Sequence, residues 1–157
     1  MLFRSVILVN NDLPVKSLAD LVAYAKANPG KLSYGSPGVG TPQHVAGEML
    51  CAQAGIKMEH IPYRGANLAD VMSGVVPVGV QNSGASLPFV KDGRVRGLAI
   101  TSLKRSSAAP DLPTVAEQGF PGFEALSWFG LMAPKGTDRK STRLNSSHLG
   151  ISYAVFC

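Results

Sequence analysis

The stretch Ser36-Pro37-Gly38-Val39-Gly40-Thr41-Pro42-Gln43-His44 joins a short apolar run to a helix pattern that begins at Pro42. Gly38 and Gly40 can adopt positive φ angles and leave the backbone N–H groups without side-chain cover. Thr41 is a favourable N-cap, and Pro42 fits the first helical position because no N–H donor is needed there. A helix N-terminus carries unpaired N–H groups and the positive end of the helix dipole. The stretch therefore predicts a site for a small anion, held mainly by backbone groups.

Strands and helices alternate on both sides of this turn. Strands are expected over residues 6–9, 32–34, 58–62, 77–81 and 95–101. Helices are expected after the capping-box pair Ser17 and Asp20, over 42–53 with a stop at Gly55, over 67–73 and over 115–118, with a helical turn at 87–90 and an extended segment at 123–132. This alternation favours an α/β sandwich with a largely parallel sheet. In such sheets ligands bind beyond the carboxyl ends of the strands, where residues 35–41 lie.

Length and composition are those of an ordinary globular chain. The 157 residues suffice for one domain or two small lobes, with 45% hydrophobic and 16% charged residues. No apolar run approaches the ~20 residues that span a bilayer. The net charge of +5 comes from Lys and Arg residues that occur singly or in pairs, so no nucleic-acid partner is expected. Cys51 and Cys157 have neither metal-ligand nor redox spacing, and Cys51 is expected to be a small buried apolar residue.

Few residues are placed for catalysis. The acidic residues are scattered over predicted helices and turns, Ser36 lacks the frame of a nucleophile elbow, and no metal-ligand spacing occurs. His44 is the third residue of the predicted helix, where its ring could reach a bound carboxylate or face solvent. His60 has no acidic partner nearby in sequence and is interpreted as structural. We therefore expect no enzymatic activity, no cofactor and no metal site.

Two further polar segments follow predicted strands. Tyr63-Arg64-Gly65 ends the strand at 58–62 and would bring a hydroxyl, a cation and a permissive backbone beside the anion site. An exposed turn with a solvated arginine is an equal alternative. Asn82-Ser83-Gly84 ends the following strand and offers polar groups either to a ligand or to its own helix.

A dinucleotide site is a competing interpretation of the same turn. Gly38-x-Gly40 follows a strand and opens a helix, and Glu59 lies about twenty residues further on, near the next strand. Gln43, however, stands at the third glycine position, and Thr41-Pro42 is foreign to that turn. The alternative function is a nucleotide-dependent cytosolic enzyme with a degenerate dinucleotide-binding loop.

Five motifs occur in an order that resembles one protein family. They are Pro29-Gly30-Lys31-Leu32-Ser33-Tyr34-Gly35 continuing through His44, Ile61-Pro62-Tyr63-Arg64-Gly65, Gly93-Arg94-Val95-Arg96-Gly97-Leu98-Ala99, Pro113-Thr114-Val115-Ala116-Glu117 and Trp128-Phe129-Gly130. Together they resemble the extracytoplasmic solute receptors of tripartite tricarboxylate transporters, often called Bug receptors. The resemblance extends over residues 6–137.

The resemblance implies a periplasmic, non-enzymatic receptor. Its fold would be α/β and periplasmic-binding-protein-like, a type II flytrap whose two lobes close on a small carboxylate. A membrane permease would take up the ligand, and the full-length receptor is expected to be a monomer. In the family, the loop that matches residues 36–41 holds one ligand carboxylate. The expected ligand-binding residues are Ser36, Gly38, Gly40, Thr41, His44, Tyr63, Arg64 and Asn82.

The chain departs from the family pattern at both ends and at Gln81. Family members begin with a signal peptide and a first-lobe segment, and neither is present here, so the chain is expected to be a fragment with one lobe and part of the other. Residues 1–137 would be receptor, with about 13–90 mostly in the second lobe and the flanks returning to the first. Residues 138–157 resemble a translated sequencing adapter and are expected to be non-native. Gln81 stands where the family often has an aspartate, so no ligand role is expected for it.

Overall fold

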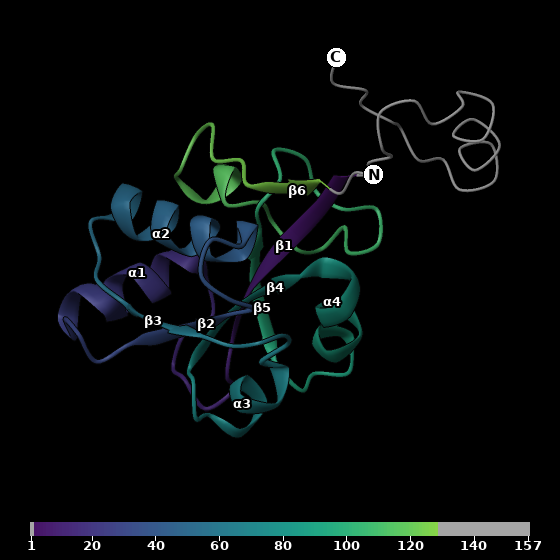
Figure 1. Cartoon of the computed structure of the whole chain (residues 1–157). Helices are drawn as coiled ribbons and strands as arrows, with labels where there is room; N and C mark the ends of the chain where they lie inside the picture. Colours follow the sequence, from purple (N-terminus) through teal and green to yellow (C-terminus); the bar gives the residue numbers. More distant parts are fainter. Residues whose placement is uncertain (1, 129–157) are drawn as a thin grey trace, which may run out of the picture.

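The structure of the chain is a computed structural model that describes residues 2–128 (Figure 1). Its elements in chain order are β1 (Leu2–Val9), α1 (Leu18–Ala27), β2 (Ser33–Ser36), α2 (Pro42–Ala54), β3 (Glu59–Pro62), α3 (Leu68–Ser73), β4 (Val78–Asn82), α4 (Ser83–Lys91), β5 (Arg96–Ile100), a 3-10 turn (Ala116–Gln118) and β6 (Leu126–Trp128). The strands form a mixed sheet with helices on both faces, as expected for a periplasmic-binding-protein-like α/β fold.

Strand β1 lies inside the sheet. The strand order is β3-β2-β4-β1-β5, and β6 pairs with the first residues of β1. β2 is parallel to β3 and β4, whereas β1 is antiparallel to β4, β5 and β6. The prediction of a largely parallel sheet is therefore wrong at β1. The apolar run of β1 indicates a buried strand but not its direction, which is decided by its insertion between β4 and β5.

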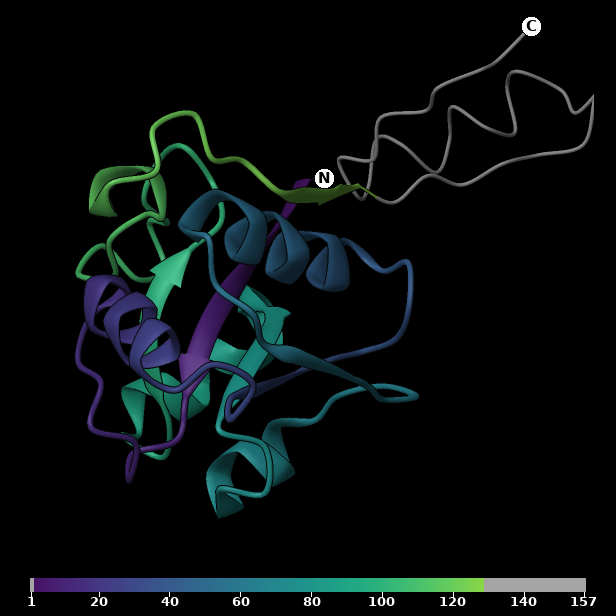
Figure 2. The same ribbon diagram turned by 90° about the vertical axis from the view of Figure 1, so that its left-hand side faces the viewer.

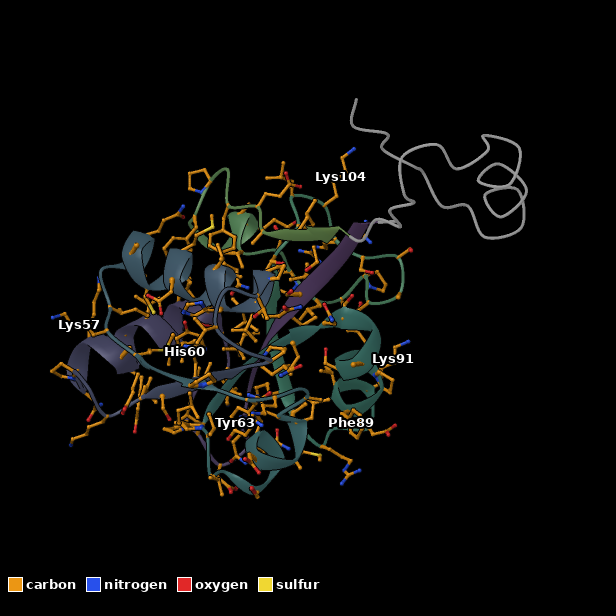
Figure 3. All side chains as sticks on the ribbon, viewed as in Figure 1. Lys57, His60, Tyr63, Phe89, Lys91 and Lys104 are labelled. Carbon is orange, nitrogen blue, oxygen red and sulfur yellow. The ribbon has the colours of Figure 1, made fainter. Side chains whose placement is uncertain are left out.

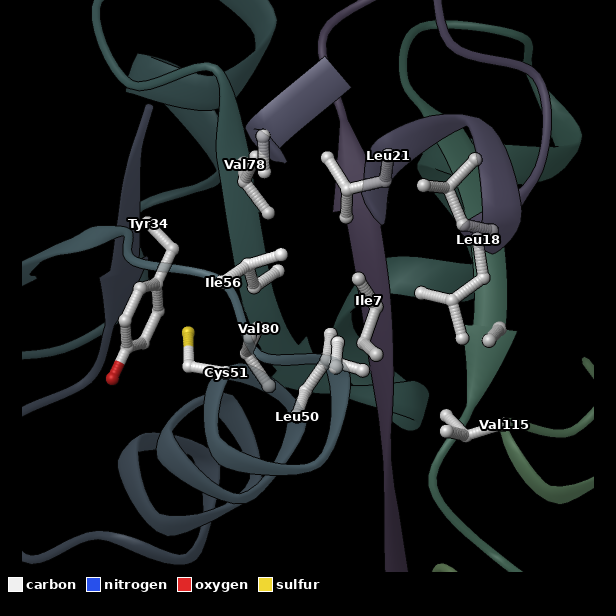
Figure 4. Packing of buried hydrophobic residues seen from close by; sticks show 14 of the residues in the cluster. Ile7, Leu18, Leu21, Tyr34, Leu50, Cys51, Ile56, Val78, Val80 and Val115 are labelled. Carbon is white, nitrogen blue, oxygen red and sulfur yellow. The ribbon is translucent and has the colours of Figure 1, made fainter. Parts of the chain in front are cut away.

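Helices α1 and α2 cover one face of the sheet (Figures 1 and 2). Leu18 and Leu21 of α1 and Leu50 of α2 are fully buried in one cluster with Ile7 of β1 and Val80 of β4 (Figure 4). Each such side chain stabilises the folded state by ~1.5–3 kcal/mol relative to an exposed one. This cluster holds α2, and with it the turn that precedes α2, in a fixed position over the ends of the strands.

The prediction that Cys51 is a small buried apolar residue is confirmed. Its side chain lies in the same cluster as Tyr34 and Ile56 (Figure 4). Burial raises the pKa of the Cys51 thiol to about 11, so the sulfur stays protonated at neutral pH. A buried, protonated thiol is chemically inert.

Helices α3 and α4 cover the opposite face. Leu68 and Val71 of α3 pack in a second cluster with Val6 and Leu8 of β1. Successive side chains of β1 therefore point to opposite faces of the sheet, as the period of a strand requires. A mixed sheet between two pairs of helices results, with both of its faces covered near β1.

Most of the predicted helix boundaries are confirmed. Ser17 accepts a hydrogen bond from the backbone of Asp20 and the Asp20 carboxylate accepts one in return, so the capping box of α1 is present. Gly55 ends α2 in the left-handed conformation with φ of 62°. Helix α4 differs from the prediction because it begins directly after β4, at Ser83, and contains Pro88.

Both flanks of residues 13–90 join the same sheet, because β1 precedes this segment, β5 follows it, and β1 pairs with β4 and β5. The assignment of residues 13–90 to a second lobe stays a prediction. Among the described helices, none combines the length and the apolar character needed to cross a membrane. The prediction that residues 138–157 are non-native lies outside the described residues.

Candidate functional site

The turn between β2 and α2 has the backbone geometry that the sequence predicts. Gly40 has φ of 78°, a left-handed conformation that side chains rarely adopt. Gly38 passes so close to the next strand that an added Cβ would lie 3.3 Å from the backbone oxygen of Tyr63. Thr41 then caps α2, because its hydroxyl oxygen accepts the N–H of His44 at 3.3 Å, and Pro42 takes the first helical position. The turn thus delivers the chain to the N-terminus of α2 at the carboxyl end of β2.

Several N–H groups of the turn are already paired, which corrects the prediction that they are uncovered. The N–H of Gly38 donates to Ser36 Oγ at 3.3 Å, and the N–H of Gly40 donates to His44 Nδ1 at 3.1 Å. The N–H and hydroxyl of Thr41 both donate to the Gly38 carbonyl, at 3.4 and 2.7 Å. The turn is therefore held in shape by its own hydrogen bonds before any ligand arrives.

Two N–H groups of the turn are left without an acceptor among the described residues. Within residues 2–128, the hydrogen bonds of the structure include none from the N–H of Val39 or of Gln43. Val39 is 73% exposed, which places the tip of the turn in solvent. The Thr41 hydroxyl could serve as a third donor if it released the Gly38 carbonyl. An anion at the tip would meet neutral donors and the positive end of the α2 dipole.

His60 of β3 contacts this turn, although its sequence context predicts only a structural role. Its ring stacks on that of His44, with centroids 4.0 Å apart, and its Nε2 lies 2.7 Å from Ser36 Oγ. Figure 3 shows His60 below the ribbon of α2, on the segment that continues to Tyr63. The parallel pairing of β2 and β3 places His60 opposite Tyr34. The predicted parallel sheet allows β2 and β3 to be neighbours, but the sequence does not give the register that places His60 beside Ser36 and His44.

The electrostatic surroundings of His60 favour a neutral ring. Burial and the neighbouring His44 lower the pKa of His60, whereas the nearby Glu48 raises it by a smaller amount. The Glu48 carboxylate accepts a hydrogen bond from the Tyr34 hydroxyl at 2.6 Å and lies 3.9 Å from His44 Nε2. Burial and this contact with Glu48 raise the pKa of Tyr34, so the phenol remains a donor. Glu48 thus lies on the Nε2 side of the His44 ring, and the Gly40 N–H donates to Nδ1 of the same ring.

Asn82 is connected to the site through Gln43. The Gln43 side chain, 4% exposed, donates from Nε2 to Asn82 Oδ1 at 2.6 Å. Asn82 stands at the N-cap position of α4, but its side chain makes no capping hydrogen bond there. The sequence pattern predicts Asn82 as a site residue but gives no such role to Gln43. The signal for Gln43 is its place in the first turn of α2, on the helix face that meets the end of β4.

Tyr63 reaches the turn with its backbone, and Arg64 lies next to it in the chain. The Tyr63 N–H donates to the Ser36 carbonyl at 2.9 Å, but its side chain points to α3, where its hydroxyl donates to Asp70 at 2.6 Å (Figure 3). The contact with Asp70 and burial raise the pKa of Tyr63 to about 12. Arg64 is exposed. The structure therefore brings Tyr63 to the turn through its backbone.

The arrangement suits anion binding better than catalysis. Ser36 Oγ and His60 Nε2 have the separation of a nucleophile and its base, but Ser36 is fully buried and out of reach of a substrate. Ser36 instead stabilises the turn, because its Oγ lies within hydrogen-bond distance of the Gly38 carbonyl. No group of three or more His, Cys, Asp or Glu side chains that could hold a metal ion occurs in the described part of the chain.

Comparison with known proteins identifies one family. The family described as "Tripartite tricarboxylate transporter family receptor" matches residues 2–148. Protein BugT of Bordetella pertussis is 38% identical over 146 residues, which are 92% of this chain and 45% of BugT. The chain therefore spans about half the length of such relatives.

Two solved structures of relatives are complexes with a ligand. Rpa4515 of R. palustris with adipate has a TM-score of 0.87 and 37% identity, over 93% of this chain and 50% of that one. MatC of Rhodopseudomonas palustris with bound malate has a TM-score of 0.81 and 25% identity, over 88% of this chain and 48% of that one. Adipate and malate are both dicarboxylates.

Proposed function

Because the chain belongs to the tripartite tricarboxylate transporter receptor family, we propose that it binds a small carboxylate at the turn between β2 and α2. The observation that carries this proposal is the N-terminus of α2, which has a Thr cap and a glycine turn but no acidic residue in its first turn. A carboxylate from outside can take the place that an acidic side chain takes at other helices. The adipate and malate of two relatives are ligands of this chemistry.

The residues of the site have separate roles in this proposal. Gly38 and Gly40 shape the turn, and Thr41 and the free N–H groups of Val39 and Gln43 donate to the carboxylate. His44 fixes the Gly40 N–H. Ser36 and Tyr63 support the turn from the strands, Asn82 holds Gln43, and exposed Arg64 attracts anions from solution.

As part of a complete receptor, the chain would act in the periplasm and deliver its ligand to membrane permease subunits. It would do so as a monomer and without catalysis. The family match favours this interpretation over a nucleotide-dependent enzyme. Gln43, at the third glycine position of the alternative motif, donates a hydrogen bond from its side chain to Asn82. A nicotinamide dinucleotide at millimolar concentration is expected to leave the amide NMR signals of the ¹⁵N-labelled chain unchanged.

The test is an NMR titration of the ¹⁵N-labelled chain with adipate and with malate, in a range that detects millimolar affinity. The amide signals of Val39, Gly40 and Gln43 should shift most, and sodium chloride at equal ionic strength should not reproduce the shifts. Thr41→Val should weaken binding at least about tenfold, because it removes a donor to a charged group. Thr114→Val is the matched control, since Thr114 also accepts a capping hydrogen bond, from Glu117, but lies away from the turn. Shifts spread over the surface, or equal in the two variants, would refute the site.

A further inference from the structure

The Gly38 carbonyl is the meeting point of the hydrogen bonds in the turn. It accepts from the Thr41 hydroxyl at 2.7 Å and lies 3.1 Å from Ser36 Oγ. Ser36 Oγ also lies 2.7 Å from His60 Nε2. A serine hydroxyl has one proton, so Ser36 cannot donate to Gly38 and to His60 at the same time. The proton of Ser36 must take one of two directions.

The state of His60 decides between these directions. When Nε2 carries no proton, it accepts the Ser36 proton, and the Gly38 carbonyl depends on the Thr41 hydroxyl. When Nε2 is protonated, it donates to Ser36 Oγ, and Ser36 donates to the Gly38 carbonyl. The Thr41 hydroxyl is then free to rotate and to donate to a bound carboxylate. The imidazolium always has this proton at Nε2, whereas the neutral ring has it in one of its two tautomers.

We propose that His60 is a positioning residue that links carboxylate binding at the turn to the uptake of a proton. The proton enters at His60 Nε2, the Ser36 proton moves its hydrogen bond from His60 to the Gly38 carbonyl, and the Thr41 proton moves its hydrogen bond from Gly38 to the ligand. Each donor keeps one acceptor throughout. This inference rests on the proposed function and adds its regulation by pH.

The groups that face His60 are compatible with this linkage. His44 of α2 stacks on the His60 ring, and the ring centroid of Tyr34 on β2 lies 5.0 Å from that of His60. Glu48 of α2 contacts both His44 and Tyr34. Because the ring of His60 favours the neutral form in the free protein, it can accept a proton when the ligand binds. The negative charge of a carboxylate at the turn then favours the imidazolium. By reciprocity, the ligand must raise the pKa of His60 by the amount that protonation raises affinity.

The experiment measures the affinity of the full chain for adipate by NMR at several pH values between 6.5 and 8, where adipate is almost fully ionised. Affinity should rise as the pH falls, by at least about threefold over this range and by no more than tenfold per pH unit for one proton. The ¹⁵N signals of the His60 ring should show a higher pKa at saturating adipate than without it. A pH-independent affinity with an unchanged His60 titration would overturn the inference while leaving the proposed function intact.

Variants separate a linkage from a merely structural effect. His60→Gln keeps a donor to Ser36 but cannot titrate, so it should bind adipate with a flat pH profile. Ser36→Ala breaks the connection to Gly38 while His60 still titrates, and should also flatten the profile. Glu59→Gln, exposed on the same strand, is the control and should keep the wild-type slope. A slope that persists in His60→Gln would assign the proton to another group, and an absence of adipate binding at every pH would refute the proposed function itself.

Discussion

The N-termini of α1 and α2 both have a hydroxyl side chain as N-cap, but only α1 has an acidic residue in its first turn. At α1, the Ser17 cap is completed by Asp20, whose carboxylate accepts the N–H groups of Ser17 and Lys16 at 3.0 and 3.1 Å. At α2, the Thr41 cap is followed by His44 at the corresponding position, and the first turn has no acidic residue. A helix N-terminus stabilises a carboxylate wherever it comes from. The comparison teaches that α1 carries its own carboxylate, whereas the first turn of α2 has none, and in the proposed function a ligand carboxylate takes that place.

The largest effect is expected when α2 receives a carboxylate of its own. His44→Glu creates the capping-box pattern of α1 at Thr41. The new side chain should compete with the ligand and repel it, so adipate affinity should fall by about a hundredfold, corresponding to a repulsion of ~1–4 kcal/mol. His44→Gln has the same capping geometry without charge, and its smaller loss of affinity isolates the charge. Equal affinities in the two variants would show that the ligand does not bind at this helix end.

A second difference concerns the glycines beside the two helices. Gly30, after α1, and Gly40, before α2, have similar φ values of 76° and 78°, and each has open space where a Cβ would lie. Gly30→Ala and Gly40→Ala should therefore each lower the free energy of unfolding by ~1–2 kcal/mol, through backbone strain alone. Only Gly40→Ala should also weaken adipate binding, severalfold, because its turn presents the donors. Chemical denaturation and NMR titration of both variants test this pair, and equal binding would remove the turn from the site.

The α1 cap should matter for stability and not for binding. Ser17→Ala removes the acceptor of the Asp20 N–H, at 3.1 Å, and should cost about 1 kcal/mol of unfolding free energy. Adipate affinity should stay unchanged because α1 has its own carboxylate. Urea denaturation measures the first effect and NMR titration the second. A loss of affinity as large as in Thr41→Val would contradict the division of roles between the two helices.

The smallest effects are those of pH on stability, and they differ at the two helices. Backbone hydrogen bonds lower the pKa of Asp20 below its usual 3.8, so its contribution is present above that pH and is lost as the pH falls further. Burial and His44 lower the pKa of His60 below 6.5, so the unfolded chain binds more protons and stability declines already as the pH falls through 6.5. Thermal unfolding between pH 3 and 8 should show both declines. His60→Gln should lose the upper one and Asp20→Asn the lower one.

Local features of the candidate site could be predicted from the sequence. Thr41 and Pro42 at the start of α2 and Gly40 with positive φ are where the motif indicates, because capping and left-handed turns depend on neighbouring residues. The stacking of His60 on His44 could not be predicted, because it depends on the register of β3 against β2 and on how α2 packs beside these strands. The buried bond from Gln43 to Asn82 likewise joins residues 39 positions apart.

By itself, the sequence determined the family, the alternation of strands and helices, the caps of α1 and α2 and the glycine turn between β2 and α2. Each of these depends on interactions within a few residues or on motifs that can be read in order. Only the tertiary structure decided that β1 runs antiparallel between β4 and β5, that the turn pairs most of its own N–H groups, and that His60 reaches Ser36. The physical reason is that strand insertion and side-chain contact between strands are settled by packing of the whole sheet, in which residues distant along the chain compete for the same partners.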